Sequence, residues 1–136
     1  MQAMQRFFNL DLTIYSMVSR IKEMVSKLPT FMGQIVKYGV LVGLRPAEII
    51  ESVKLTNNQL SFSKYYKTDN HTLEHFRFPD IFIRATKKAY ISFVTPEILE
   101  IARYTEQCPS YNAIRLACQK IGIKMDMRYC RKIFAS

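Results

Sequence analysis

The sequence Gly-Leu-Arg-Pro-Ala-Glu at residues 43–48 marks a turn between two predicted helices. Gly43 follows a mostly apolar stretch that begins at residue 31, and glycine commonly ends a helix because it adopts left-handed backbone angles without strain. Pro46 suits the first turn of a new helix, and Glu48 then lies near the positive end of that helix. The stretch therefore predicts one helix up to Gly43 and a second that ends before Asn57, with Arg45 at the turn between them.

A longer helix is predicted upstream, from residue 1 to Leu28. Its apolar residues recur three or four positions apart with basic residues between them, which is the pattern of an amphipathic helix. Pro29 and Thr30 then separate it from the next helix. The apolar positions are Leu12, Tyr15, Val18, Ile21, Met24, Val25 and Leu28.

Short runs of alternating or β-branched residues replace the helical pattern after Asn58. Three strands are predicted, at residues 60–63, 81–83 and 89–94, and together they favour a small antiparallel sheet. The polar and aromatic stretch 64–79 has no clear period, which indicates an extended loop or a hairpin arm.

Helical patterns return in the last part of the chain. They predict helices at residues 96–107 and 110–121 and a last one from about residue 126. Gly122 closes the second of these. The fold class is therefore α+β, mainly helical, with a small three-stranded antiparallel sheet in a single domain that spans residues 1–136.

The composition favours a polyanionic partner. Lys and Arg number 20 against 11 Asp and Glu, which gives a formal charge of +9 and a pI near 9.6. A field of this sign attracts nucleic acid first and an anionic membrane surface second. The longest apolar run, at residues 35–44, is interrupted by Lys37 and two glycines and is far too short to span a membrane. We therefore expect a soluble protein that binds nucleic acid and no membrane.

The cysteines and histidines indicate neither disulfides nor a metal site. Cys108, Cys118 and Cys130 form no CxxC pair and follow no signal peptide, so we expect reduced thiols in an intracellular, cytoplasmic protein. His71 and His75 stand four apart, but their order with the intervening glutamate differs from the zinc-protease motif, and no third ligand is evident. The sequence therefore predicts no metal and no cofactor.

A second segment, Arg-Tyr-Cys-Arg-Lys-Ile-Phe-Ala-Ser at residues 128–136, places Arg128, Arg131 and Lys132 on neighbouring helical positions. Taken alone it is typical of a solvated basic face, just as the turn at Arg45 alone is typical of a helix cap with a surface ion pair. Taken together, the two segments resemble the two arginine boxes of the tyrosine recombinases, the phage-type integrases. The Phe-Ala-Ser ending and the Thr-Pro pair after the third predicted strand are most similar to integrases of archaeal spindle-shaped viruses.

The resemblance implies that arginine side chains bind the scissile phosphate of the DNA backbone. A guanidinium meets two oxygens with parallel hydrogen bonds and keeps its proton, so Arg45 and Arg131 are the expected pair. Arg128 stands where the family usually carries His or Lys, and because arginine does not release its proton its role is electrostatic. The family also uses a lysine in a β-hairpin turn as general acid, which corresponds to Lys87 rather than to Lys88. The alternative is that both are solvated lysines of a loop.

The resemblance also implies contacts with double-stranded DNA outside the reacting phosphate. Lys88 and Lys132 are expected there, together with Lys64 and Lys67. The last two interleave with aromatic residues as a stacking platform for nucleic acid does, and a loop that packs on its own sheet is the alternative.

The complete family reaction is strand cleavage and rejoining through a 3'-phosphotyrosyl intermediate, without metal or high-energy cofactor, by an oligomer assembled on DNA. The family's nucleophilic tyrosine lies beyond the second box, and nothing follows Ser136 here, so we expect DNA binding without cleavage. One alternative is a non-catalytic DNA-binding or regulatory remnant. Another is a module that binds acidic proteins, which predicts no salt-dependent affinity for DNA.

Overall fold

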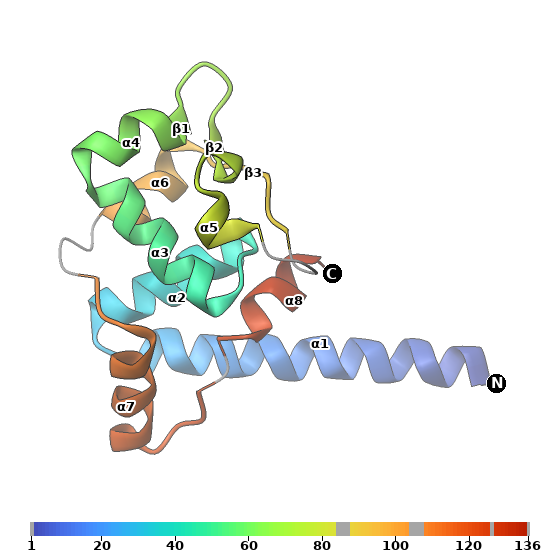
Figure 1. Cartoon of the computed structure of the whole chain (residues 1–136). Helices are drawn as coiled ribbons and strands as arrows, with labels where there is room; N and C mark the ends of the chain where they lie inside the picture. The colour runs from blue at the N-terminus through green and yellow to red at the C-terminus, as the bar shows by residue number, and fades with distance from the viewer. Residues whose placement is uncertain (1, 84–87, 104–107, 126, 136) are drawn as a thin grey trace.

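The structure is a computed structural model of the chain that describes residues 2–83, 88–103, 108–125 and 127–135, with side chains from residue 13 onward. Helices form most of it, and a small sheet lies at one end of the molecule, at the top in Figure 1. This is the mainly helical α+β fold that the sequence predicts. The elements are α1 (Gln2–Lys27), α2 (Thr30–Val42), α3 (Pro46–Asn57), α4 (Gln59–Tyr65), β1 (Tyr66–Lys67), β2 (Thr72–Glu74), the 3-10 turn η1 (His75–Arg77), α5 (Pro79–Phe82), β3 (Ile91–Phe93), α6 (Pro96–Arg103), α7 (Tyr111–Ile121) and α8 (Tyr129–Ala135).

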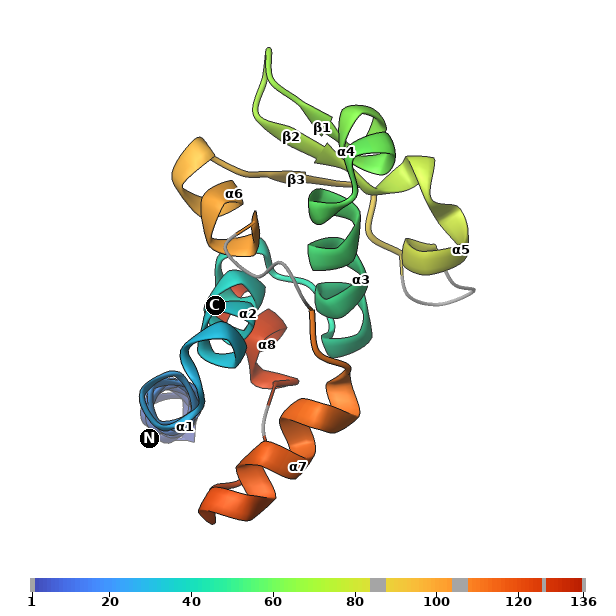
Figure 2. The ribbon, with the colours of Figure 1, turned by 90° about the vertical axis from the view of Figure 1, so that its left-hand side faces the viewer.

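Helix α2 is the centre of the helical part. It packs against α1, α3, α6 and α8, and Figure 2 shows it between α1 on one side and α3 and α8 on the other. The mostly apolar composition that predicts this helix fits its position, because neighbouring helices cover most of its surface; Phe31, Lys37 and Leu41 remain exposed. Its buried residues are Met32, Gly33, Ile35, Val36, Tyr38, Gly39 and Val42.

The helix boundaries around residues 43–48 are those that the sequence predicts. Gly43 follows α2 with a φ of 76°, in the left-handed region, and its N–H bonds to the carbonyl of Gly39. Pro46 is the first residue of α3. Farther on, the Ser110 side chain caps α7 and Gly122, with a φ of 77°, ends it. Local capping chemistry thus sets both turns.

The three-stranded antiparallel sheet is present, but two of the three predicted strands are wrong. Its order is β1-β2-β3, so Leu73 of β2 pairs with Tyr66 on one side and with Ser92 on the other. Strand β3 confirms the prediction for residues 89–94. The other two strands come from the segment 64–79, which forms the hairpin that was one of its two predicted structures.

Residues 60–63 are helical instead of extended because Asn58 caps them. Its side-chain oxygen accepts hydrogen bonds from the N–H groups of Leu60 and Ser61, which opens α4. Residues 81–83 mostly belong to α5, where Pro79 starts a short helical turn; Ile83 forms an isolated bridge with Lys88. In both places a helix-start residue outweighed the β propensity of a short apolar run.

The last predicted helix starts later in the structure than the sequence predicts, and the end of the helix predicted at residues 96–107 is not tested. Helix α6 ends at Arg103, and residues 104–107 lie outside the described residues. Helix α8 begins at Tyr129 and not near residue 126, while Met127 just before it is fully buried. No helix in the described ranges has the length and apolar composition needed to cross a membrane.

A chain of hydrogen bonds through the core ties the sheet to the helices. The Ser52 hydroxyl of α3 bonds to the hydroxyls of Tyr38 and Tyr65 at 2.8 and 2.7 Å. Tyr65 then bonds to His75 Nδ1 at 2.7 Å, and His75 Nε2 bonds to the Ser92 hydroxyl of β3 at 2.7 Å. Tyr38, Ser52, Tyr65 and His75 are all fully buried. Because each bond satisfies a polar group that is shielded from water, the chain fixes the relative positions of these elements.

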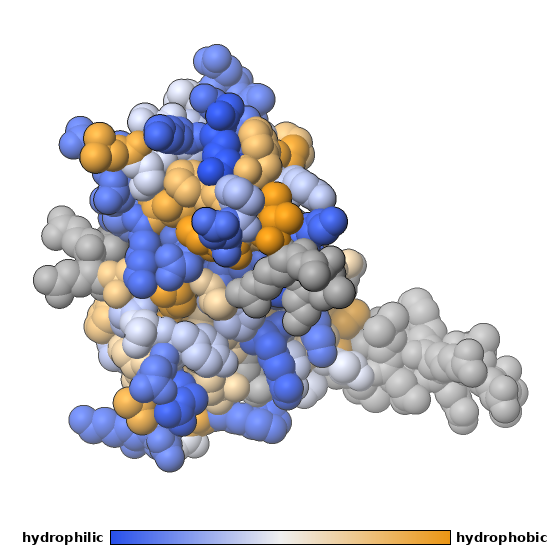
Figure 3. All heavy atoms as spheres, in the orientation of Figure 1, coloured by the Kyte–Doolittle hydropathy of each residue, from blue (hydrophilic) through white to orange (hydrophobic). Residues whose placement is uncertain are grey.

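Hydrophilic and apolar side chains are mixed on the face of the molecule that Figure 3 shows. On the face in Figure 3, hydrophilic side chains cover the tip of the β1–β2 hairpin, and apolar ones reach the surface near α5. Exposed apolar residues of β3 include Phe93, with 73% of its surface accessible.

Candidate nucleic-acid interface

Four cations line one open cleft of about 730 Å³. Arg45 comes from the turn before α3, Arg128 from the turn before α8, and Arg131 and Lys132 from α8 itself. Tyr111, the first residue of α7, completes the wall. The structure therefore brings together the two arginine-bearing segments that the sequence singles out. We call this hollow the cationic cleft.

Arg45 is held at the cleft by Glu48. The Glu48 Oε1 atom accepts a hydrogen bond from the Arg45 backbone N–H at 3.0 Å and lies 3.4 Å from the Arg45 guanidinium. Glu48 is only 1% exposed, so the carboxylate is shielded from water while the guanidinium remains partly accessible. A guanidinium has five N–H donors, and the contact with Glu48 leaves the others for a ligand in the cleft.

Arg131 is fixed by the end of α2. Its Nη1 donates a hydrogen bond to the Gly43 carbonyl oxygen at 3.0 Å, at the negative C-terminal end of that helix. The neighbouring Phe134 packs on Gly43 so closely that a Cβ at this glycine would collide with the phenyl ring. Helix α8 is thus docked on the same turn that presents Arg45.

Arg128 and Lys132 flank one aromatic ring. Their cationic groups lie 5.4 and 5.9 Å from the centre of the Tyr129 ring, within the range of a cation–π interaction. Both reach the cleft from there. Tyr129 therefore positions two of the four cations.

The charge of the cleft selects an anion. Among the described residues that line it, four are cationic and none is acidic. Guanidinium forks match the paired oxygens of a phosphate or carboxylate, and the convergence of several cations raises the local concentration of such a group.

Tyr111 is the cleft residue that sequence reasoning missed. It is 39% exposed and lies at the first position of α7, directly after the capping Ser110. The cap predicts where the helix begins, but the contact of Tyr111 with the cleft depends on how α7 lies beside α3. That relationship has no local signal in the sequence.

The other predicted site residues do not line the cationic cleft. Lys87, the expected general acid, lies outside the described residues. Lys88 is exposed and pairs with Ile83 in an isolated bridge. Lys64 is exposed on α4, and the amino group of Lys67 lies 3.8 Å from the Glu74 carboxylate.

The predicted stacking platform beside these lysines is wrong for Tyr65. Its side chain is fully buried in the hydrogen-bonded chain of the core, so it offers no face to a base. Tyr66 is 8% exposed and bonds through its hydroxyl to His71 and to the Val94 carbonyl.

His75, Cys108 and Cys130 are buried or half-buried in the fold. Burial lowers the pKa of His75 to about 4, and both of its ring nitrogens are hydrogen-bonded in the core. Burial raises the pKa of the Cys108 thiol to about 11 and that of Cys130 to about 12, so both are protonated at neutral pH. Within the described residues, no group of three or more His, Cys, Asp and Glu could hold a metal ion.

Comparison of the chain with protein-family models, with curated proteins and with solved structures gave no match. We therefore base the functional assignment on the residues of the cationic cleft.

Proposed function

We propose that the cationic cleft binds a backbone phosphate of double-stranded DNA and that the chain is the core of a tyrosine recombinase catalytic domain. The observation that carries the proposal is that Arg45 and Arg131 line the same cleft although they come from segments far apart in the sequence. These are the segments that resemble the two arginine boxes of the family.

In this proposal Arg45 and Arg131 hold the nonbridging oxygens of the phosphate. Attack at phosphorus builds negative charge on these oxygens, and donors that are already in place stabilise it without reorganisation. The contacts of Arg45 with Glu48 and of Arg131 with Gly43 supply that rigidity. Arg128 and Lys132 add positive charge at the edge of the cleft.

Cleavage needs two further groups. A tyrosine oxygen forms a bond to phosphorus while the bond to the 5' deoxyribose oxygen breaks, and a general acid gives that oxygen a proton. Lys87 is the acid that the resemblance implies. Tyr38 and Tyr65 are unsuited as nucleophiles, because burial raises the pKa of both hydroxyls and both are enclosed in the core.

We assign the nucleophile to no tyrosine among the described residues, so we propose that this chain binds DNA without cutting it. Contacts by Lys64, Lys67 and Lys88 with DNA outside the cleft, and assembly of the complete protein as an oligomer on DNA, are part of the same proposal.

The test is the affinity for a fluorescently labelled DNA duplex over a range of salt concentrations. Each lost phosphate contact lowers the slope of log affinity against log salt by about one. Arg45→Ala and Arg131→Ala are each expected to do so. Arg115→Ala is the matched control, because Arg115 is exposed on α7 and bonds to Asn112 outside the cleft. A wild-type affinity for duplex DNA that does not depend on salt would overturn the proposal and favour a module that binds acidic proteins.

A non-catalytic DNA-binding or regulatory remnant uses the same cleft and differs in one outcome. If a tyrosine-bearing partner chain restores strand cleavage, Arg45→Ala should abolish that cleavage while it weakens binding only modestly. If no partner restores cleavage and Arg45→Ala acts only as a lost phosphate contact, the remnant is favoured.

A further inference from the structure

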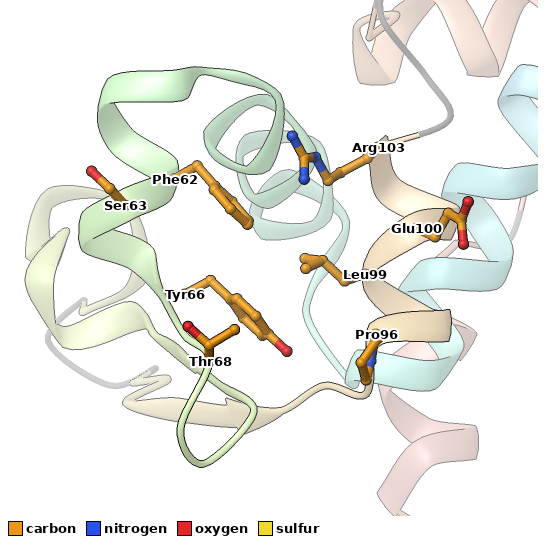
Figure 4. Close-up of a pocket in the computed structure, with 8 residues that line it drawn as sticks. All are labelled: Phe62, Ser63, Tyr66, Thr68, Pro96, Leu99, Glu100 and Arg103. Carbon is orange, nitrogen blue, oxygen red and sulfur yellow. The ribbon is translucent and has the colours of Figure 1, made fainter.

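A second hollow lies between α4 and α6 and shares no lining residue with the cationic cleft. Its volume is about 830 Å³, within the range of roughly 300–1,000 Å³ that is usual for small-molecule sites. Figure 4 shows Phe62 and Tyr66 on one side of it and Leu99 and Pro96 on the other. We call it the aromatic groove.

One wall of the groove is a pair of parallel rings. Phe62 and Tyr66 are four residues apart, and their ring centres lie 5.7 Å apart with an angle of 17° between the planes. Tyr66 is held by its hydroxyl, which bonds to His71 Nδ1 at 3.0 Å and to the Val94 carbonyl at 3.3 Å. Because Tyr66 is only 8% exposed, most of the accessible aromatic surface of this wall belongs to the half-buried Phe62 ring, and Tyr66 supports it.

A cation stands over this wall. The Arg103 guanidinium of α6 lies 4.6 Å from the centre of the Phe62 ring. Among the described residues, Arg103 forms no ion pair. A guanidinium that lies over a ring keeps N–H donors at its edge, and these can serve a ligand. In Figure 4 the guanidinium points toward Phe62, while Glu100 of the same helix points away from the rings.

The groove and the cationic cleft lie at opposite ends of α3. Arg45 precedes the first residue of this helix and α4 follows its last, and its 12 residues extend about 18 Å. Figure 2 shows α4 at one end of α3 and α7 and α8 near the other. One nucleic-acid molecule is long enough to reach both sites.

We propose that the aromatic groove holds an unpaired nucleobase of a nucleic-acid strand. A base has a planar face that stacks on aromatic rings and on a guanidinium, and an edge whose oxygen and nitrogen atoms accept hydrogen bonds from Arg103. The net charge of +9 attracts the polyanion that carries the base. The proposal rests on nucleic-acid binding by this chain, and it adds the recognition of bases to the contact with phosphates.

A nucleobase fits these observations better than an apolar side chain of a partner protein. An apolar anchor needs only the rings, Pro96 and Leu99. Its arrival would take water from the Arg103 guanidinium, which forms no ion pair with the described residues, without replacing the hydrogen bonds to that water. The accepting edge of a base replaces them.

The test compares two single strands that differ only in their bases. A short oligothymidine and an abasic oligonucleotide with the same number of phosphates are titrated into the full chain, so the phosphate contribution is the same for both. Stacking of one base predicts a preference of roughly tenfold for the oligothymidine. Phe62→Leu, which keeps an apolar side chain but removes the ring, should bring the ratio close to one.

Two controls separate this proposal from the phosphate cleft. Phe76→Leu removes another exposed phenyl ring that carries a guanidinium, that of Arg77 at 5.2 Å, and should leave the preference unchanged. Arg45→Ala should lower the affinity for both oligonucleotides by the same factor. Equal affinity of wild-type protein for the two strands would overturn the base-binding proposal and leave the phosphate cleft untouched.

A second measurement decides the matter even if neither strand binds. Adenosine, which has no phosphate, is titrated into the chain while the ring-proton resonances of Phe62 and Tyr66 are followed by NMR. Shifts that disappear in Arg103→Gln and persist in Phe76→Leu support the groove as a base site. No shift at millimolar adenosine, or shifts that Arg103→Gln does not change, would overturn it.

Discussion

The Arg131 guanidinium donates a hydrogen bond of 3.0 Å to the carbonyl oxygen of Gly43, across 88 residues of sequence. This bond makes the arginine of α8 part of the turn that carries Arg45. The Phe134 ring on the same face of Gly43 reinforces the contact. The two cations therefore keep a fixed relationship without a ligand, which is what recognition of a phosphate requires.

Replacing Arg131 by lysine should separate charge from geometry. Lysine keeps the positive charge but not the planar fork that serves Gly43 and a ligand together. We expect Arg131→Lys to keep most of the salt dependence of duplex binding and to lose roughly tenfold in affinity, about 1.4 kcal/mol. Fluorescence anisotropy measures both quantities. An affinity equal to that of the wild type would show that the fork is not used.

Alanine at Gly43 should destabilise the fold more than alanine at Gly122. Both glycines have left-handed backbone angles, which cost a residue with a Cβ about 1–2 kcal/mol. A Cβ at Gly122 meets nothing within 4 Å, whereas one at Gly43 collides with Phe134. Urea unfolding should show a larger loss for Gly43→Ala, and the difference should shrink when Phe134→Ala is added. Equal losses would mean that α8 moves away at no cost.

His75 should make the fold sensitive to mild acid. Burial lowers its pKa in the folded protein from 6.5 to about 4, so between these values the unfolded chain takes up a proton that the folded chain does not. The contribution of His75 to the free energy of unfolding is therefore fully present above pH 6.5. The free energy of unfolding should fall by up to about 3 kcal/mol as the pH is lowered to 4. Urea unfolding as a function of pH measures this slope. His75→Gln should remove it, and His71→Gln, a change of the exposed histidine, should retain it; the same slope in all three proteins would contradict the assignment.

Removing the Ser52 hydroxyl should leave the buried hydroxyl of Tyr38 without its partner. Ser52 bonds to both Tyr38 and Tyr65, and among the described residues only Tyr65 has a further side-chain bond, to His75. We expect Ser52→Ala to cost about 1–3 kcal/mol of unfolding free energy. Tyr38→Phe with Ser52→Ala should cost less than the sum of the single changes, because no hydroxyl is then stranded. Strict additivity in urea unfolding would argue against a coupled network.

The sequence predicts the helices better than the sheet, and the reason is physical. Helices α1, α2, α3 and α7 have long apolar periods and local stop signals, so each can be located from its own residues. The strands of the hairpin have two and three residues, too few to show a period. The sheet is stabilised by burial of Leu73, which pairs with Tyr66 of β1 on one side and with Ser92 of β3 on the other. That arrangement exists only once the chain has folded.

The residues of the candidate site also fall into a group that the sequence predicts and a group that it does not. Arg45, Arg128, Arg131 and Lys132 could be named in advance because they stand in two short motifs. Tyr111 and the aromatic groove could not, since each depends on the position of one helix beside another. Sequence patterns thus identify residues with distinctive chemistry and miss those that acquire a role from packing.

The docking of α8 on α2 also has a consequence for the order of folding. The Cys130 thiol contacts the Val36 carbonyl across 94 residues, and Arg131 reaches Gly43 across almost as many. Contacts of such long range form late, because the entropy of closing the loop must be lost before they contribute stability. Helices α1 to α3 are local by comparison. We therefore expect the cationic cleft to be among the last parts of the molecule to form, so the proposed DNA binding would report completion of the native state and a partly folded chain should lack it.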